Sequence, residues 1–186
     1  HLLRLPSLGF LLESRELSRL PEIAAYKEAV VAVRADNRRG TGFNLDPHGL
    51  IITNYHILET AETAEIKWQG GRSEMAALLV SQPQSDLAML AAEGEDLPFL
   101  QLETENLPDP GDEVYMIGNP LGFFQVVNRA EYLGLAFIAG REMPVIRIRG
   151  PVYQGNSGSP VINLDGKVIG VVFARSATAE DDGDNT

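Results

Sequence analysis

The chain contains no cysteine among its 186 residues, which excludes both disulfide bonds and cysteine-based catalysis. Basic residues are also in short supply, with 15 Lys and Arg against 26 Asp and Glu. The resulting net charge of −11 repels the phosphates of nucleic acids and of anionic lipids. We therefore expect neither nucleic acid nor an anionic membrane surface as a partner.

Long hydrophobic runs are absent as well. The apolar stretch 2–12 is interrupted by Arg4 and Pro6, and it is about half of the roughly 20 residues that a membrane-spanning helix needs. We expect no direct membrane insertion, and two interpretations of this stretch stay open: the stub of a removed anchor, or a docking arm. Leu, Glu and Arg at helical spacings over 11–29, with a break at Pro21, predict a helical arm over residues 1–28.

The remaining sequence predicts a single all-β domain. A hydrophobic content of 44% is enough for a substantial core, and short β-type runs alternate with turn residues. The proline-rich stretch 97–112 is interpreted as a connector between two halves. The expected strands are 30–35, 42–45, 50–53, 64–68, 75–80 and 87–91 before the connector, and 113–117, 124–135, 145–149, 159–162 and 168–173 after it.

The last ten residues, 177–186, are small and acidic and predict a solvated tail. Asp181, Asp182 and Asp184 hint at calcium, but the stretch lacks the spaced oxygens and the terminal Glu of an EF-hand loop. No metal site and no cofactor are expected.

The segment 154–160, with the sequence QGNSGSP, places Ser157 among small residues. Such a loop presents a nucleophilic hydroxyl beside converging backbone N–H groups, which are the donors of an oxyanion hole. Gly155 keeps that space free of a side chain. Because a serine hydroxyl is a weak nucleophile by itself, the chain must also supply a general base and a group that orients it.

Two of the three histidines are poor candidates for the base, since His1 is the first residue of the chain and His48 lies in a turn-like cluster. His56 follows the apolar run 50–53, at a predicted strand end, where catalytic groups are commonly placed. Asp86 opens the apolar run 87–91 and is the strongest candidate for the orienting carboxylate. Taken alone, His56 would be a packed or surface histidine and Asp86 a turn or cap residue.

The order His56, Asp86, Ser157 is that of the chymotrypsin-type proteases, and it differs from the orders in α/β-hydrolases and subtilisins. Ordered sequence blocks carry the same resemblance through most of the chain, from about residue 29 to about residue 174. The sequence resembles the trypsin-like serine proteases, and among them the HtrA/Deg-type bacterial branch. The matching blocks are GTGF (40–43), GLIITNYH (49–56), SDLAML (85–90), IGNPLG (117–122) and GNSGSP (155–160), with GKVIGV (166–171) as the following strand.

This resemblance implies a chymotrypsin-like fold, with two six-stranded antiparallel β-barrels over residues 29–176 behind the helical arm. It implies a serine endopeptidase that hydrolyses protein substrates through an acyl-enzyme, in protein quality control or regulated proteolysis. His56 would be the base, Asp86 its orienting partner and Ser157 the nucleophile, with the N–H groups of Gly155 and Ser157 as the oxyanion hole. The alternative is a catalytically silent pseudo-protease that binds peptides.

The resemblance also locates the specificity pocket. Its base corresponds to Pro151, so strict cleavage after Lys or Arg is not expected, and the lining favours a small or medium apolar side chain unless Arg175 turns the preference toward acidic residues. Asn156 stands where proteases activated by a new N-terminus carry Asp, which argues against that activation. Ser159 stands where the nucleophile loop of the family often carries a second glycine. The expected substrate-binding residues are Pro151, Val152, Val172, Phe173, Ala174 and Arg175.

Family habit further implies an extracytoplasmic location, in the periplasm or cell envelope, and makes a homotrimer through the N-terminal arm an open possibility. Relatives often carry a C-terminal PDZ domain. The residues after Arg175 are too few for one, so the sequence is either a protease core from a longer protein or a relative that works alone.

Overall fold

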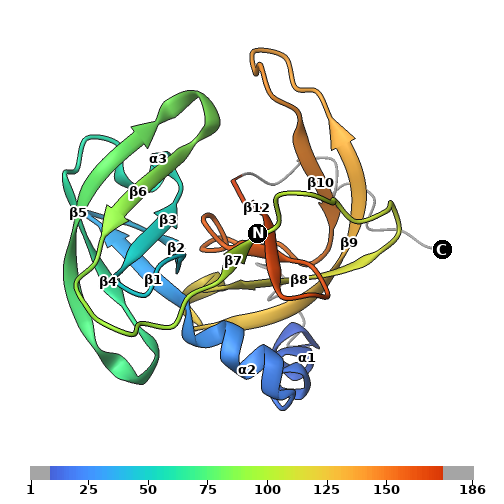
Figure 1. Cartoon of the computed structure of the whole chain (residues 1–186), viewed down its shortest axis with the longest axis horizontal. Coiled ribbons are helices and arrows are strands. Elements are labelled where there is room, and N and C mark those ends of the chain that lie inside the picture. Colours follow the sequence, from blue (N-terminus) through green and yellow to red (C-terminus); the bar gives the residue numbers. More distant parts are fainter. Residues whose placement is uncertain (1–8, 174–186) are drawn as a thin grey trace, which may run out of the picture.

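The computed structural model of the chain describes residues 9–173. Two β-structures stand next to each other, and the two N-terminal helices lie beneath the second one (Figure 1). The expected acidic tail 177–186 and the expected pocket residues Ala174 and Arg175 lie outside the described residues, as does the start of the predicted arm, residues 1–8.

The first half is a closed barrel of six antiparallel strands. Alternate residues along its strands point inward, so that side chains such as Val31, Val33 and Ile66 are fully buried in one cluster. In barrel order the strands are β1 (Val30–Ala35), β2 (Arg38–Asn44), β3 (Leu50–Thr53), β6 (Leu87–Ala91), β5 (Ser73–Gln82) and β4 (Thr63–Lys67).

The second half is a six-stranded sheet in which five strands run antiparallel to their neighbours. Its two outermost strands, β10 and β7, are not paired with each other within residues 9–173, so this sheet is not closed by hydrogen bonds as the first barrel is. The order is β10 (Val145–Arg149), β9 (Val126–Ala136), β8 (Glu113–Gly118), β11 (Pro160–Ile162), β12 (Lys167–Val171) and β7 (Gln101–Leu102).

The predicted connector 97–112 contains a short strand, β7. It pairs in parallel with the start of β12, and the N–H of Glu103 extends the pairing by donating to the carbonyl of Val168 (2.8 Å). The Glu103 carboxylate then accepts the N–H groups of Glu105 and Asn106, which holds its pKa below the usual range. The connector therefore covers the edge of β12 that would otherwise be unpaired.

The arm forms two helices, α1 (Gly9–Leu17) and α2 (Pro21–Glu28). Pro21 begins α2, because a missing N–H costs nothing in the first turn of a helix. Helix α1 packs on β9 and buries Phe10, Ser14 and Leu17. The remaining helical elements are α3 (Tyr55–Leu58) and the short 3₁₀ turns η1 (Gln69–Gly71), η2 (Pro83–Ser85) and η3 (Pro120–Gly122).

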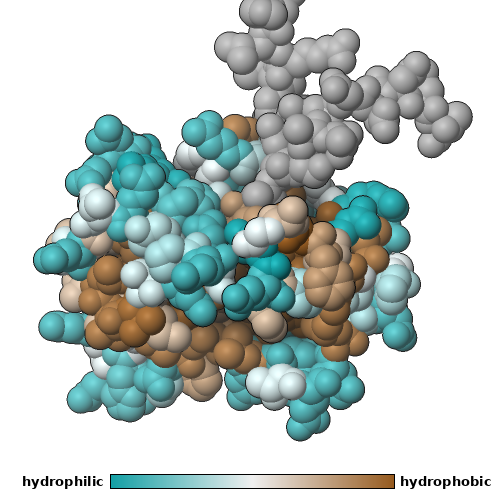
Figure 2. All heavy atoms as spheres, turned by 90° about the horizontal axis from the view of Figure 1, so that it is seen from above, coloured by the Kyte–Doolittle hydropathy of each residue, from teal (hydrophilic) through white to brown (hydrophobic). Residues whose placement is uncertain are grey.

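A second buried cluster joins the two halves and the arm. It contains residues from the first barrel such as Phe43, residues from the second sheet such as Ile117, and Leu17 and Ile23 from the helices. The arm thus shares a core with the β-domain. Hydrophobic patches interrupt the hydrophilic surface (Figure 2), and exposed apolar side chains include Met75 and Leu79 of β5. Within residues 9–173, none of the helices has the length and apolar character needed to cross a membrane.

Candidate active site

His56 and Asp86 are brought together by strand pairing in the first barrel. Strands β3 and β6 are neighbours, with Thr53 opposite Ala88, so the residues just beyond these strand ends meet. The Nδ1 atom of His56 lies 2.7 Å from Oδ2 of Asp86, and the backbone N–H of His56 donates to Oδ1 (2.9 Å). The Asp86 side chain is 14% exposed and that of His56 45%, so the carboxylate is sheltered while the imidazole stays accessible.

The backbone of Asp86 is fixed by the same short helix that carries His56. Its carbonyl accepts the backbone N–H of Tyr55 (3.1 Å) and the side-chain amide of Asn54 (3.0 Å). Asp86 itself has a φ of 55°, in the left-handed region that Asp tolerates better than most residues. Four hydrogen bonds therefore set the position of the imidazole relative to the carboxylate.

Ser157 lies on the loop between β10 and β11 and is held against β2 of the first barrel. The N–H of Thr41 donates to the carbonyl of Ser157 (2.8 Å), and the N–H of Gly158 donates to the carbonyl of Val172 (2.8 Å). A Cβ atom on Gly158 would collide with the carbonyl oxygen of Thr41, and one on Gly40 would collide with Ile57. The glycines of the GTGF and GNSG blocks are thus required by the close approach of strand and loop.

The expected oxyanion donors are unoccupied. Neither Gly155 N–H nor Ser157 N–H donates a hydrogen bond to another residue of the described part of the chain. Gly155 has a φ of +99°, and a Cβ atom there would strike the carbonyl oxygen of Asn119. Both N–H groups therefore stay available to an acceptor, as the predicted oxyanion hole requires.

The supports of this loop come from residues that the sequence interpretation did not single out. The Thr41 hydroxyl donates to the carbonyl of Gly155 (2.8 Å) and accepts the N–H of Asn119 (3.0 Å). The N–H of Leu121 donates to the carbonyl of Gln154 (2.7 Å). Thr41, Asn119 and Leu121 belong to matching sequence blocks, but a block reveals no hydrogen-bond partners.

Within residues 9–173, no hydrogen bond joins the Ser157 hydroxyl to the ring of His56. The two neighbouring departures from the family pattern are both buried: Ser159 is fully buried and Asn156 is 2% exposed. Their side chains meet over Gly118, where a Cβ atom would collide with the Ser159 hydroxyl. Ser159 therefore fills space behind the loop rather than facing the accessible side of Ser157.

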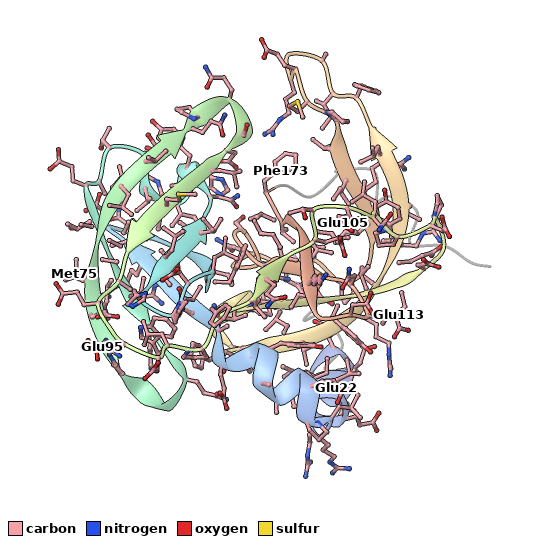
Figure 3. The ribbon with its side chains drawn as sticks, in the orientation of Figure 1. Glu22, Met75, Glu95, Glu105, Glu113 and Phe173 are labelled. Atoms are coloured by element: carbon pink, nitrogen blue, oxygen red, sulfur yellow. The ribbon has the colours of Figure 1, made fainter. Side chains whose placement is uncertain are left out.

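The expected pocket residues divide into two groups. Val152 packs with the buried Val172 in a cluster of the second sheet, and Pro151 is half-buried beside it. Phe173 lies between the β5–β6 and β9–β10 hairpins (Figure 3). Its ring is covered by the Arg141 guanidinium at 4.1 Å from the centroid.

The other described histidine, His48, stands apart from this site in an exposed turn. The Asp46 carboxylate accepts the N–H of His48 (2.8 Å) and lies 3.1 Å from its Nδ1 atom. These contacts, the backbone hydrogen bond first, lower the pKa of Asp46. The pair resembles His56 and Asp86 in chemistry, but it has no serine loop beside it.

Comparison with known proteins identifies the family. Residues 40–171 match the trypsin-like peptidase domain. The chain belongs to this family. It is 32% identical over 146 residues to a probable periplasmic serine endoprotease, DegP-like, of Marinomonas sp., a match that covers 74% of this chain and 30% of that protein. The chain thus spans about a third of the length of such curated relatives.

Solved structures give the same result for the trypsin-like domain. The Rv3671c protease of M. tuberculosis in its inactive form has a TM-score of 0.77 and 28% identity, over 86% of this chain and 84% of that one. The serine endoprotease from Yersinia pestis has a TM-score of 0.75 and 28% identity, over 84% of this chain and 57% of that one. The predicted trypsin-like, HtrA/Deg-type family and the predicted chymotrypsin-like all-β fold are confirmed.

Proposed function

We propose that this trypsin-like domain is a serine endopeptidase that cleaves protein substrates through an acyl-enzyme, with His56, Asp86 and Ser157 as its catalytic residues. The observation that carries the proposal is the paired contact of the sheltered Asp86 carboxylate with both the Nδ1 atom and the backbone N–H of His56. This contact leaves Nε2 of the accessible imidazole as the nitrogen able to take a proton.

The reaction follows from these positions. Ser157 Oγ attacks the scissile carbonyl carbon while His56 Nε2 takes its proton, and Asp86 stabilises the imidazolium that forms. The carbonyl oxygen becomes an oxyanion and accepts the free N–H groups of Gly155 and Ser157. Collapse of this intermediate expels the amine, which receives the proton from His56. Water, activated by the same imidazole, then hydrolyses the Ser157 ester.

The substrate is an extended segment of a protein. Such a segment adds as a strand along the backbone beyond β12 at Phe173, because the N–H and the carbonyl of Val172 already pair with Ser159 and Gly158 of the nucleophile loop. Pro151, Val152 and Val172 provide apolar surface for a small or medium side chain next to Ser157. The acidic surface disfavours nucleic acid.

The cellular context of this activity is drawn from the relatives. We place the protein outside the cytoplasm, since the curated relatives are named periplasmic. A role in protein quality control or regulated proteolysis fits an enzyme that accepts unfolded chains. Assembly as a homotrimer through the arm is the remaining part of this proposal.

Incubation with unfolded casein tests the function. The wild-type chain should degrade casein and react covalently with a fluorophosphonate probe, whereas Ser157→Ala should do neither. Ser73→Ala, which changes an exposed serine at the start of β5, serves as the matched control and should behave like the wild type. Equal degradation by the wild type and Ser157→Ala would show that the nucleophile is wrong.

One observation favours a second candidate, the peptide-binding pseudo-protease. The hydroxyl of Ser157 makes no hydrogen bond to His56 within the described residues. Catalytic hydrogen bonds are often long before substrate binds, so this geometry is compatible with an enzyme. A wild-type chain that binds unfolded casein, yet neither cuts it nor reacts with the fluorophosphonate, would establish the binding module instead.

A further inference from the structure

Helix α1 reaches the nucleophile loop through a single aromatic side chain. The ring of Phe10 lies 4.9 Å from that of Tyr153 and meets the ring of Phe123 edge-on at 6.1 Å. Tyr153 immediately precedes Gln154 and Gly155, and Phe123 immediately follows the η3 turn. Phe10 is only 6% exposed, so it fills the space between the two segments.

The two segments that Phe10 contacts are joined by one backbone hydrogen bond, from Leu121 N–H to the Gln154 carbonyl (2.7 Å). All described peptide bonds are trans, so the carbonyl of Gln154 and the N–H of Gly155 point in opposite directions from the same peptide plane. The bond to Leu121 therefore directs the Gly155 N–H away from η3. Rotation of this peptide would replace an oxyanion donor with a carbonyl oxygen.

The η3 segment is poorly suited to hold this bond by itself. Leu121 has a φ of 53°, a left-handed conformation that a leucine side chain disfavours. Leu121 and Phe123 are 44% and 43% exposed, so they add little packing of their own. Hydrogen bonds hold the two ends of the segment instead: the N–H of Asn119 donates to the Thr41 hydroxyl (3.0 Å), and the N–H of Gln125 donates to the Asn119 side chain (2.8 Å). These bonds lie on either side of Leu121, and the ring of Phe10 adds a further contact from outside the segment at Phe123.

Helix α1 is firmly attached and can provide that contact. The side-chain amide of Asn128 donates to the carbonyl of Phe10 (3.1 Å) and to the Glu13 carboxylate (3.1 Å). The N–H of Val127 donates to the hydroxyl of Ser14 (3.0 Å), which is buried. Strand β9 thus fixes the first turns of α1 and, with them, the ring of Phe10.

We infer that Phe10 is a positioning residue for the oxyanion hole: packed between Phe123 and Tyr153, it maintains the Leu121–Gln154 hydrogen bond and thereby the direction of the Gly155 N–H. The inference rests on the serine-endopeptidase function proposed above. Phe10 touches neither substrate nor reacting atoms, so its effect passes entirely through the loop. The N-terminal helix is in this sense part of the catalytic apparatus.

The test compares Phe10→Ala with Leu17→Ala in the full chain. Leu17 is a buried residue of the same helix, 2% exposed, and it packs in the central cluster instead of on the loop. The quantities to be measured are the amide hydrogen exchange of Leu121, by NMR on leucine-labelled protein, and kcat, KM and thermal stability. Phe10→Ala should speed Leu121 exchange about tenfold or more while Leu17→Ala leaves it near the wild-type rate at matched stability.

The kinetic readout is the split between kcat and KM. Loss of one oxyanion donor costs on the order of 10²–10³ in kcat, so partial loss in Phe10→Ala should reduce kcat about 10- to 100-fold with little change in KM. Affinity for a peptide boronic acid, which forms a tetrahedral adduct with Ser157, should fall in parallel. Phe10→Leu keeps an apolar side chain, so it should change Leu121 exchange and kcat in the same direction as Phe10→Ala but by a smaller factor. If Phe10→Ala does not fold, Phe10→Leu takes its place in the test.

Two results would overturn the inference. Leu121 exchange in the Phe10 variants that matches the wild type would show that Phe10 does not hold the bond. Equal losses of kcat in Phe10→Ala and Leu17→Ala would reduce Phe10 to a general stabilising residue. A wild-type chain without peptidase activity would refute the proposed function, and the exchange rate of Leu121 would still decide whether Phe10 supports this hydrogen bond.

Discussion

The two halves of the candidate active site are built differently. His56 and Asp86 belong to one closed barrel, where adjacent strands place them and side-chain hydrogen bonds join them directly. Ser157 lies on a loop whose contacts come from other parts of the chain: Thr41 in the first barrel, Leu121 in η3 and Phe10 beyond it in the arm. The base is held locally, whereas the nucleophile loop depends on distant segments.

This difference assigns different consequences to mutations. A change in the His56–Asp86 pair should impair the chemistry and leave the fold intact, because the surrounding backbone hydrogen bonds persist. A change in a support of the nucleophile loop should affect stability and rate together, because the same contacts join the two halves. Mutations in the His56–Asp86 pair and in the supports of the nucleophile loop therefore test whether rate and stability are affected separately in the first case and together in the second.

The largest effect is expected for Asp86→Asn. The oxygen of an amide can still accept the backbone N–H of His56, but it cannot do so and also stabilise the imidazolium. The amide moreover favours the wrong tautomer of the His56 ring. We expect kcat to fall about 10⁴-fold, with the unfolding free energy little changed, as measured by peptide hydrolysis and chemical denaturation.

Asp46→Asn is the matched control for this change, since Asp46 contacts His48 in a similar way at an exposed turn. It should leave kcat at the wild-type value. A comparable loss of kcat in both variants, or a large loss of stability in Asp86→Asn, would contradict the conclusion that the general base is held by local contacts.

A smaller but double effect is expected for Thr41→Val. Valine has the shape of threonine without the hydroxyl, so the Gly155 carbonyl loses its donor and the Asn119 N–H loses its acceptor. Thr41 is fully buried, and leaving such partners unsatisfied costs about 1–3 kcal/mol of unfolding free energy. Because Gly155 then moves more freely, kcat should fall roughly tenfold, within the cost of losing one oxyanion donor.

Two further variants sharpen this result. Thr41→Ser keeps the hydroxyl and should restore most of kcat. Thr53→Val removes a buried hydroxyl that donates its hydrogen bond to the Thr41 carbonyl (2.7 Å) and not to the nucleophile loop. This variant should lose similar stability with a smaller loss of kcat. Equal kcat in Thr41→Val and the wild type would show that the loop does not depend on the first barrel.

The difference between local and distant contacts also explains which features the sequence predicted well. Strands 30–35, 50–53, 87–91 and 145–149 have the predicted bounds, because their apolar patterns reflect local burial. The proximity of His56 and Asp86 followed from chain order and strand ends, and their mutual hydrogen bonds agree with the proposed roles.

Contacts between distant segments were not predictable in this way. Strand β7 has only two residues and exists because it pairs with β12, so no periodicity announced it. The support of Gly155 by the Thr41 hydroxyl joins residues 114 positions apart. Phe10 was one apolar residue in an arm whose helical pattern said nothing of which ring it would meet.

The smallest expected effect concerns the substrate side of the second half, where Arg141 of the β9–β10 hairpin covers Phe173. A cation–π contact at a partly exposed site contributes about 0.5–1 kcal/mol, or roughly a two- to fivefold change in an equilibrium. Because Phe173 lies at the edge proposed to pair with substrate and not at the oxyanion hole, Arg141→Ala should raise KM for peptides by about this factor with kcat unchanged.

Arg141→Lys keeps the charge, so its KM should lie between those of the wild type and Arg141→Ala. A loss of kcat instead would mean that the hairpin, like Phe10 and Thr41, also supports the nucleophile loop, and the second half would then depend on one more distant segment.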